Sequence, residues 1–379
     1  MMLNQGSRHR VSAISAAAFC VLILASSKSI AGAAAAPDLP SIEVVPQPRS
    51  TDQQIKIAGD YLAGHGVTQN FKLAAYWYEK AAGAGDPLAE LQIGYLYEAG
   101  LGVDKDSARA AHWYQLAVVG GSVRAKANLA IAYLWGSGVA RNESMALKLL
   151  NEGAASGSGL AACYLGDFYA FGIGVPENSA VAEQWYRKGA SLHNPMAEFD
   201  LATLFSDGKD HSHDLRAAAT LFRQSAAAGY VPAMHSLGLL LVRNPGLAQS
   251  SSEALDILNA AANAGSWKSS MLLGVLARDG NGVPRNNEAA YYYFRVASLQ
   301  GGEATAKLLE TDLRNLSVRL GSGQAQAIDS QAGNWYRQHH FALEFVDKEG
   351  ENWAGFPLVA LAFPQNGAHA VQLLTSPQN

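Results

Sequence analysis

The chain has 379 residues, of which 49% are hydrophobic and 16% are charged, and its formal net charge at pH 7 is −4. This composition is typical of a folded globular protein and excludes an intrinsically disordered one. A nucleic-acid-binding protein would need a basic face, so the mild negative charge argues against that class as well.

The N-terminus has the order of a secretory signal peptide. Arg8 and Arg10 form a short basic region, an apolar run follows at 11–26, and residues 31–33 offer an A-x-A cleavage site. The alternative is an N-terminal membrane anchor, but the run is short for a span of about 20 residues. We therefore predict a signal peptide over 1–33 and a mature chain that is periplasmic or secreted.

The segment 34–50 is rich in proline and alanine and is predicted to be a flexible leader. After signal cleavage Cys163 is the one remaining cysteine, so no intramolecular disulfide can form. We expect Cys163 to be a small buried hydrophobic residue on a helix. The alternative, a redox-active thiol or an intermolecular bridge, has no basic neighbours to support it.

From residue 51 to 302 the sequence repeats every 36 residues, in seven copies without insertion or deletion. One bulky position recurs at Tyr61, Tyr97, Tyr133, Tyr169, Phe205, Leu241 and Ala277. A small residue stands three places earlier, at Ala58, Gly94, Ala130, Gly166, Ala202, Gly238 and Gly274. A fixed period of this length indicates a solenoid or another repeat array.

One repeat is predicted to be two helices joined by a turn. Leu91 and Gly94 belong to a pattern with three- and four-residue spacings, which is helical. Glycine is a poor helix former, so the recurring small residue at Gly94 predicts a close approach of the second helix. The glycines of 100–102 end the first helix, because glycine adopts the left-handed conformation readily. The second helix would bury Trp113 and Tyr114.

The pattern A-x-x-x-L/I-G-x-x-Y-x-x-G-x-G-V, followed by A-x-x-W-Y and A-A-x-x-G, resembles the Sel1-like repeat family, whose members are related to tetratricopeptide repeats. Residues 89–97 and 100–103 match it closely, and the resemblance covers 52–302. The turns at 206–211 and 243–247 depart from it, although the helices around them keep the pattern. The resemblance implies an all-α, right-handed superhelical solenoid of seven repeats.

The repeats are predicted to occupy 51–302. Residues 303–338 are expected to form capping helices, because a solenoid must close the exposed end of its core. Residues 339–379 fit no repeat and contain many aromatic residues, which suggests a short β-structured or docking extension.

A polar stretch around 206–214 offers the main candidates for catalysis or metal binding, since His339 and His340 are expected to be solvated. Ser206 and Lys209 match the S-x-x-K motif of penicillin-binding enzymes, but no K-T-G motif follows. His211 and His213, with nearby aspartates, supply ligand types that bind zinc or nickel. A solvated turn produces such clusters without the geometry of a site, so we predict no catalytic residue, no metal and no cofactor.

In a tetratricopeptide-like superhelix the first helices line the concave surface, and the resemblance implies the same here. The partner-binding stripe predicted on these helices contains Gln92, Tyr95, Asn128, Trp135, Tyr164, Asp167, Phe171, Asp200 and Asp207. Aromatic anchors with amide and acidic groups suit an extended peptide or a partner helix. The alternative is that several of these side chains face the neighbouring repeat.

The predicted function is that of an exported non-catalytic scaffold that binds a protein or peptide partner, with no nucleic acid and no stable membrane span. The resemblance implies roles in envelope complex assembly or in the regulation of signalling, which is an argument by analogy. One alternative is a cell-wall-active hydrolase or a binding protein for peptidoglycan or polysaccharide. Another is a structural adaptor that docks through the C-terminal tail.

Overall fold

The computed structural model describes residues 50–207 and 213–338, and within these ranges the chain is helical and contains no strand. The signal peptide, most of the leader, the centre of the 206–211 turn and the C-terminal extension lie outside the described residues. The helices are α2 Thr51–Ala63, α3 Phe71–Ala82, α4 Pro87–Ala99, α5 Ser107–Val119, α6 Val123–Trp135, α7 Glu143–Ala155, α8 Gly159–Phe171, α9 Ser179–Ser191, α10 Pro195–Asp207, α11 Leu215–Ala227, α12 Val231–Arg243, η1 Pro245–Leu247, α13 Glu253–Asn263, α14 Trp267–Asp279, α15 Asn287–Leu320 and α16 Ser322–Gln338.

The helices from α2 to the first part of α15 form seven antiparallel pairs, which confirms the predicted all-α solenoid. In the four pairs whose small residue is a glycine, the first helix presents that glycine to the bulky residue of the second helix. A Cβ atom at Gly94 would lie 2.7 Å from Cε1 of Tyr114, and one at Gly274 would lie 2.6 Å from Cδ1 of Phe294. The close approach predicted from the recurring small residue is therefore confirmed.

Within most pairs a glycine turn connects the first helix to the second. The same turn packs against the previous repeat. Gly100 ends α4 in the left-handed conformation at φ 71°, as predicted. Gly102, also at φ 71°, packs so tightly on the start of α3 that a Cβ would lie 2.2 Å from the carbonyl carbon of Phe71. Asp106 then caps α5 by accepting hydrogen bonds from the backbone amides of Ala108 and Arg109, both at 3.0 Å.

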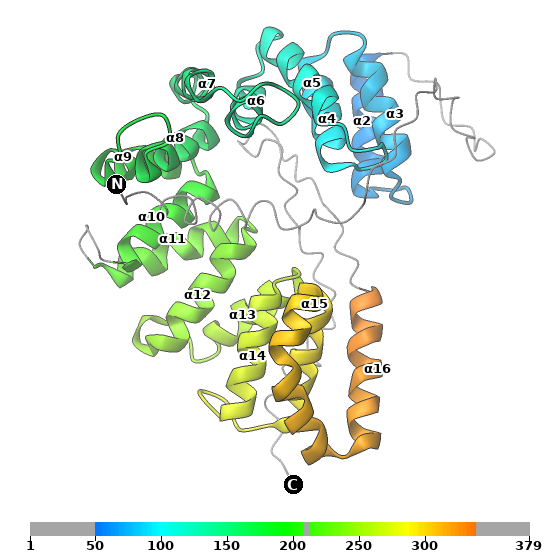
Figure 1. The fold of residues 1–379 in the computed structure, drawn as a ribbon, viewed down its shortest axis with the longest axis vertical. Helices are drawn as coiled ribbons and strands as arrows, with labels where there is room; N and C mark the ends of the chain where they lie inside the picture. The colour runs from blue at the N-terminus through cyan, green and yellow to red at the C-terminus, as the bar shows by residue number, and fades with distance from the viewer. Residues whose placement is uncertain (1–49, 208–212, 339–379) are drawn as a thin grey trace, which may run out of the picture.

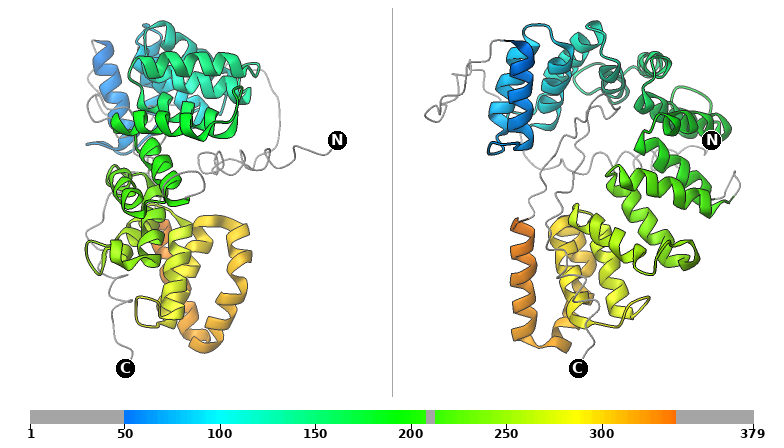
Figure 2. Two further views of the ribbon diagram at one scale, coloured as in Figure 1. Left: turned by 90° about the vertical axis from the view of Figure 1, so that its left-hand side faces the viewer. Right: turned by 180° about the vertical axis from the view of Figure 1, so that it is seen from behind.

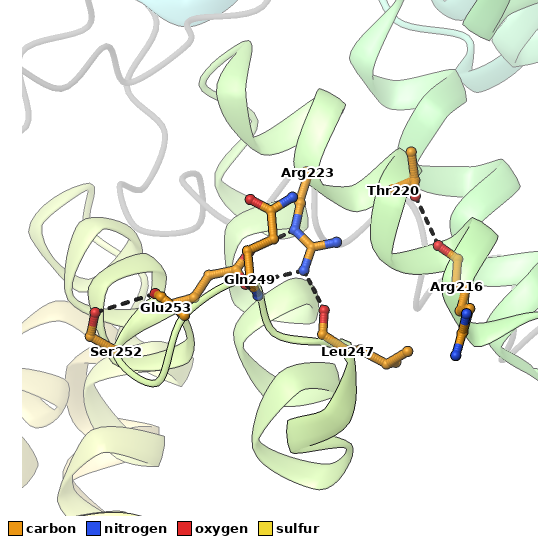
Figure 3. Close-up of polar contacts among 8 residues, drawn as sticks. Arg216, Thr220, Arg223, Leu247, Gln249, Ser252 and Glu253 are labelled. Carbon is orange, nitrogen blue, oxygen red and sulfur yellow. Dashed lines mark hydrogen bonds and ion pairs between the residues drawn. The ribbon is translucent and has the colours of Figure 1, made fainter.

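The sixth pair, α12 and α13, has a different connection. Instead of a glycine turn, η1 and an extended loop lead into α13, and Arg223 of α11 holds this loop (Figure 3). The Arg223 guanidinium pairs with Glu253 (Nε to Oε1, 2.6 Å) and donates a hydrogen bond to the Leu247 carbonyl (2.7 Å). The helix interface is unchanged, since a Cβ at Gly238 would lie 2.5 Å from Leu258.

The C-terminal end of the array is closed by the second part of α15 and by α16. Gly302 (φ 69°, ψ −161°) breaks α15, so the residues after it form a separate helical arm. Leu309 and Leu316 of that arm are buried together with Ile328 and Ala332 of α16. The last helix, α16, begins at Ser322.

The pairs follow one another along an open arc, with α2 and α3 at one end and α16 at the other (Figures 1 and 2). First helices of successive repeats contact each other directly, as α6 does with α8, α8 with α10, and α12 with α14. In Figure 1, α6 and α8 accordingly lie on the inner side of the arc and α7 and α9 on the outer side. Among the described helices, none combines the length and the apolar character that a membrane span requires.

Candidate partner-binding surface

All nine residues of the predicted stripe lie on the first helices α4, α6, α8 and α10. Three of them are buried, since Tyr95, Asn128 and Tyr164 are only 4%, 7% and 8% exposed. The structure corrects the prediction for these three: the neighbouring helices cover them, so they support the surface and do not form it. The other six, Gln92, Trp135, Asp167, Phe171, Asp200 and Asp207, keep partial or full exposure.

Two aromatic side chains lie at the C-terminal ends of the first helices of the third and fourth repeats. Trp135 is the last residue of α6 and is 40% exposed, and Phe171 is the last residue of α8 and is partly exposed. They occupy the same repeat position on two helices that contact each other. Exposed aromatic residues of this kind are common anchors at protein interfaces. Whether these two bind a partner stays a prediction.

Next to these rings, two carboxyl groups lie on the neighbouring helices α8 and α10. Asp167 accepts a hydrogen bond from the Tyr186 hydroxyl at 2.7 Å, and Asp200 accepts one from the Cys163 thiol at 3.1 Å. Tyr186 comes from α9, and its ring packs over Gly166. The hydroxyl therefore reaches the inner side because glycine leaves room for the ring.

Loss of solvent raises the pKa of both carboxyl groups. Loss of solvent raises the pKa of Asp200 to about 7, and the hydrogen bond from Cys163 opposes that shift. The pKa of Asp167 is raised well above its ordinary range, first by loss of solvent and then by the charge of Asp200, against the hydrogen bond from Tyr186. Both carboxyl groups therefore take up protons more readily than exposed aspartates do, because burial disfavours their charged forms.

A third carboxyl group extends this region to α4. Glu98 accepts a hydrogen bond from the Tyr114 hydroxyl at 2.5 Å, and burial raises the pKa of Glu98. The pKa of the Tyr164 hydroxyl is raised by burial first and also by the charges of Asp167 and Glu98. Glu98 was not among the residues predicted from the sequence, although it follows Tyr95 of the predicted stripe by three residues on the same helix.

The thiol of Cys163 lies at the centre of this region and is fully buried, at 0% exposed. Burial raises the pKa of the thiol well above its usual value, and the charges of Asp200 and Asp167 raise it further. A reactive cysteine needs the opposite shift, so this environment supports the expected structural role.

The described part of the 206–214 stretch offers no assembled site. Ser206 lies at the C-terminal end of α10 and donates its hydroxyl to the Thr203 carbonyl at 3.0 Å, whereas the S-x-x-K chemistry uses a serine at a helix start. Lys209 and His211 lie outside the described residues. Among the residues that the structure describes, no group of three or more His, Cys, Asp and Glu side chains is arranged to hold a metal ion.

Comparison with protein families gives one match, to the Sel1 repeat, which recurs six times and covers more than half of the chain. The matched segments are 54–86, 87–118, 123–158, 159–194, 195–230 and 268–302. The unmatched interval between the last two segments contains α12, η1 and α13, the pair with the altered connection. A search of curated proteins returned no match.

Solved structures with related folds include a Sel1 repeat protein from Oxalobacter formigenes, with 22% sequence identity and a TM-score of 0.51 over 70% of this chain and 99% of that one. A protective antigen of uropathogenic Escherichia coli with an SLR fold is 24% identical over 79% and 72% of the two chains, with a TM-score of 0.39. An immunity protein from Pseudomonas aeruginosa is 21% identical over 53% and 71%, with the same TM-score of 0.39. At these identities the similarity concerns the fold alone.

Proposed function

Because the chain belongs to the Sel1 repeat family, we propose that it is an exported scaffold that binds a protein or peptide partner on the inner face of α4, α6, α8 and α10. The observation that carries this proposal is the pair Trp135 and Phe171, aromatic side chains left accessible at one repeat position on adjacent inner helices. Solenoids of stacked repeats present extended concave surfaces that suit this use.

Accessible polar groups next to the rings favour a polypeptide over a purely apolar ligand. Gln92, Asp167 and Asp200 keep partial exposure on the same helices. Amide and carboxyl groups can accept hydrogen bonds from a partner backbone or side chain and so fix its register. The rings would supply contact area and the polar groups would supply orientation.

The proposal can be tested by capture of a crosslinked partner from envelope extracts with the tagged protein. The variant W135A/F171A removes both rings without touching a fully buried side chain, so it should remain helical by circular dichroism. We expect at least a tenfold loss of capture, because central aromatic anchors typically carry ~2 kcal/mol or more of binding free energy. The control V119A truncates a residue of α5 that is 86% exposed and should capture normally.

Equal capture by W135A/F171A and by the native chain would contradict the inner-face proposal. A deletion of 341–379 would then test the C-terminal adaptor, which should lose its partner without that segment. Export is a separate part of the proposal and rests on the signal-like sequence of 1–33. Fractionation of cells with and without this segment tests it, and retention of the native chain in the cytoplasm would refute it.

A further inference from the structure

The surface made by Trp135, Asp167, Phe171 and Asp200 combines aromatic rings with carboxyl groups on three adjacent inner helices. We propose that this surface receives a basic side chain, lysine or arginine, from the segment of the partner that docks there. The inference rests on the proposed function and adds the chemical character of the partner to it.

The two carboxyl groups accept hydrogen bonds from neutral donors, and the described part of the chain pairs neither of them with a cation. Asp167 and Asp200 accept from a phenol and a thiol, and within the described ranges no ion pair includes either of them. Burial is the largest cause of their raised pKa values, and the neighbouring groups that add to or oppose it are a carboxyl, a phenol and a thiol. The pKa values of two further phenols, Tyr164 and Tyr230, are raised by burial first and also by the charge of Asp167.

The basic side chains of the helix packed behind this surface are engaged elsewhere. On α9, Arg187 pairs with Glu183 at 2.6 Å, and the Lys188 ammonium lies 5.0 Å from the centre of the Trp185 ring. Acidic groups without cations attract a cation from outside, so charge complementarity favours a basic segment over an acidic or neutral one.

The position of the rings also favours a basic side chain. Phe171 follows Asp167 by four residues on α8, so the two side chains lie on the same side of the helix. Trp135 stands at the equivalent position on α6. The methylene groups of a lysine or arginine can lie on such rings while the charged end reaches the carboxylates, and the ring faces attract the cation as well.

Protonation gives the inference a distinct signature. A bound cation favours the ionised carboxylates, whereas Asp200, with its pKa near 7, and Asp167 hold protons at lower pH. Affinity should therefore rise as the pH increases through about 7 and fall as the pH decreases, by at most about tenfold per pH unit for each proton released. Glu198 on α10 also has its pKa raised to about 7, so the pH profile must be compared with that of a variant that lacks the pair.

Selection of a displayed library of random dodecapeptides on the purified full chain tests the inference even while the partner is unidentified. Peptides whose binding is lost in W135A/F171A report on this surface, and we expect them to be enriched in lysine or arginine. A synthetic, fluorescently labelled peptide from this group should bind D167N/D200N at least tenfold more weakly than the native chain. The control D104N/D256N changes net charge equally at two exposed positions and should bind normally.

The outcomes separate this inference from the proposed function. Surface-dependent peptides that lack basic residues, or that bind D167N/D200N normally, would overturn the inference and leave the proposed function standing. If no selected peptide depends on Trp135 and Phe171, the proposed function itself fails. If D167N/D200N does not fold, the affinity of the native chain for the lysine-containing peptide is measured between pH 5.5 and pH 8. An affinity that does not rise over this range would overturn the inference.

Discussion

The fourth repeat (α8 and α9) and the sixth (α12 and α13) pack their two helices in the same way but connect them by different turns. In the fourth, Gly172 and Gly174 both take φ 64° and close the turn. In the sixth, Asn244 follows the first helix at φ −132°, and an ion pair from Arg223 holds the longer loop. Both pairs keep a glycine under the bulky residue of the second helix. The helix interface therefore sets the period, and the turn can be replaced.

The same comparison explains why the inner surface differs along the array. In the fourth repeat the residue over the glycine is Tyr186, whose hydroxyl donates a hydrogen bond to Asp167. In the sixth it is Leu258, which has no hydroxyl to offer. One core position thus decides both the packing of a helix pair and the polarity of its inner edge.

The largest effect is expected where a turn glycine touches the previous repeat. A Cβ at Gly138 would lie 2.0 Å from the carbonyl oxygen of Ser107, and the residue has φ 73°. We expect G138A to reduce the free energy of unfolding by about 3 kcal/mol, from left-handed strain plus backbone displacement. In the last repeat, Gly282 has φ 74° with open space around it, so G282A should cost only ~1 kcal/mol. Equal losses in urea unfolding would refute the docking role of the turn.

The second effect concerns the helix interface. G274A places a Cβ against Phe294 and should cost about 2 kcal/mol of unfolding free energy, as overpacking does. The double variant G274A/F294L recreates the Ala130 and Leu150 pair of the third repeat and should recover most of that loss. A double variant no more stable than G274A, measured by thermal and urea unfolding, would show that the small and bulky positions are not coupled.

The third effect tests what replaces the glycine turn in the sixth repeat. R223M removes a pair whose side chains are 21% and 17% exposed, and we expect a loss of about 1.5 kcal/mol, between the values for exposed and buried pairs. The matched control K56M breaks the exposed pair with Asp60 and should cost less than ~0.5 kcal/mol. Similar losses for both would mean that the Arg223 contacts do not hold the loop.

The smallest effect is expected from the carboxyl groups Asp167 and Asp200 of the fourth and fifth repeats. The sixth repeat has none at these places, since Ser236 and Leu239 occupy the positions equivalent to Asp200 and Asp167. Because its pKa is raised in the folded state to about 7, Asp200 lowers stability as the pH rises from about 4 to 7. The variant D200N should therefore gain a few degrees in melting temperature at pH 7.5 relative to the native chain, and little at pH 4. A gain of the same size at both pH values would exclude ionisation as its cause.

The period of 36 residues was sufficient to predict the fold, because each copy carries the same small and bulky residues that lock its two helices. The left-handed glycines and the retained helices of the sixth repeat were also predictable from local chemistry. The break at Gly302 falls at the boundary between 302 and 303 where the sequence analysis ended the repeats and began the capping helices.

The candidate surface was predictable only in part. The spacing of residues along one helix shows which of them share a face of that helix. The rotation between successive repeats decides whether a residue on that face contacts solvent or the next helix. This is why Trp135 stayed accessible while Asn128, two turns earlier on the same helix, became buried. The contact of Cys163 with Asp200 depends on the same rotation, because it joins two different repeats.

Site-specific photocrosslinking in intact cells tests the central claim most directly. A benzoylphenylalanine at position 171 on α8 would report on the inner face, and one at position 119 on α5 would serve as an exposed control. The account predicts a discrete protein adduct from position 171 and none from position 119. Adducts from position 119 alone would contradict it and move the binding surface away from the inner helices.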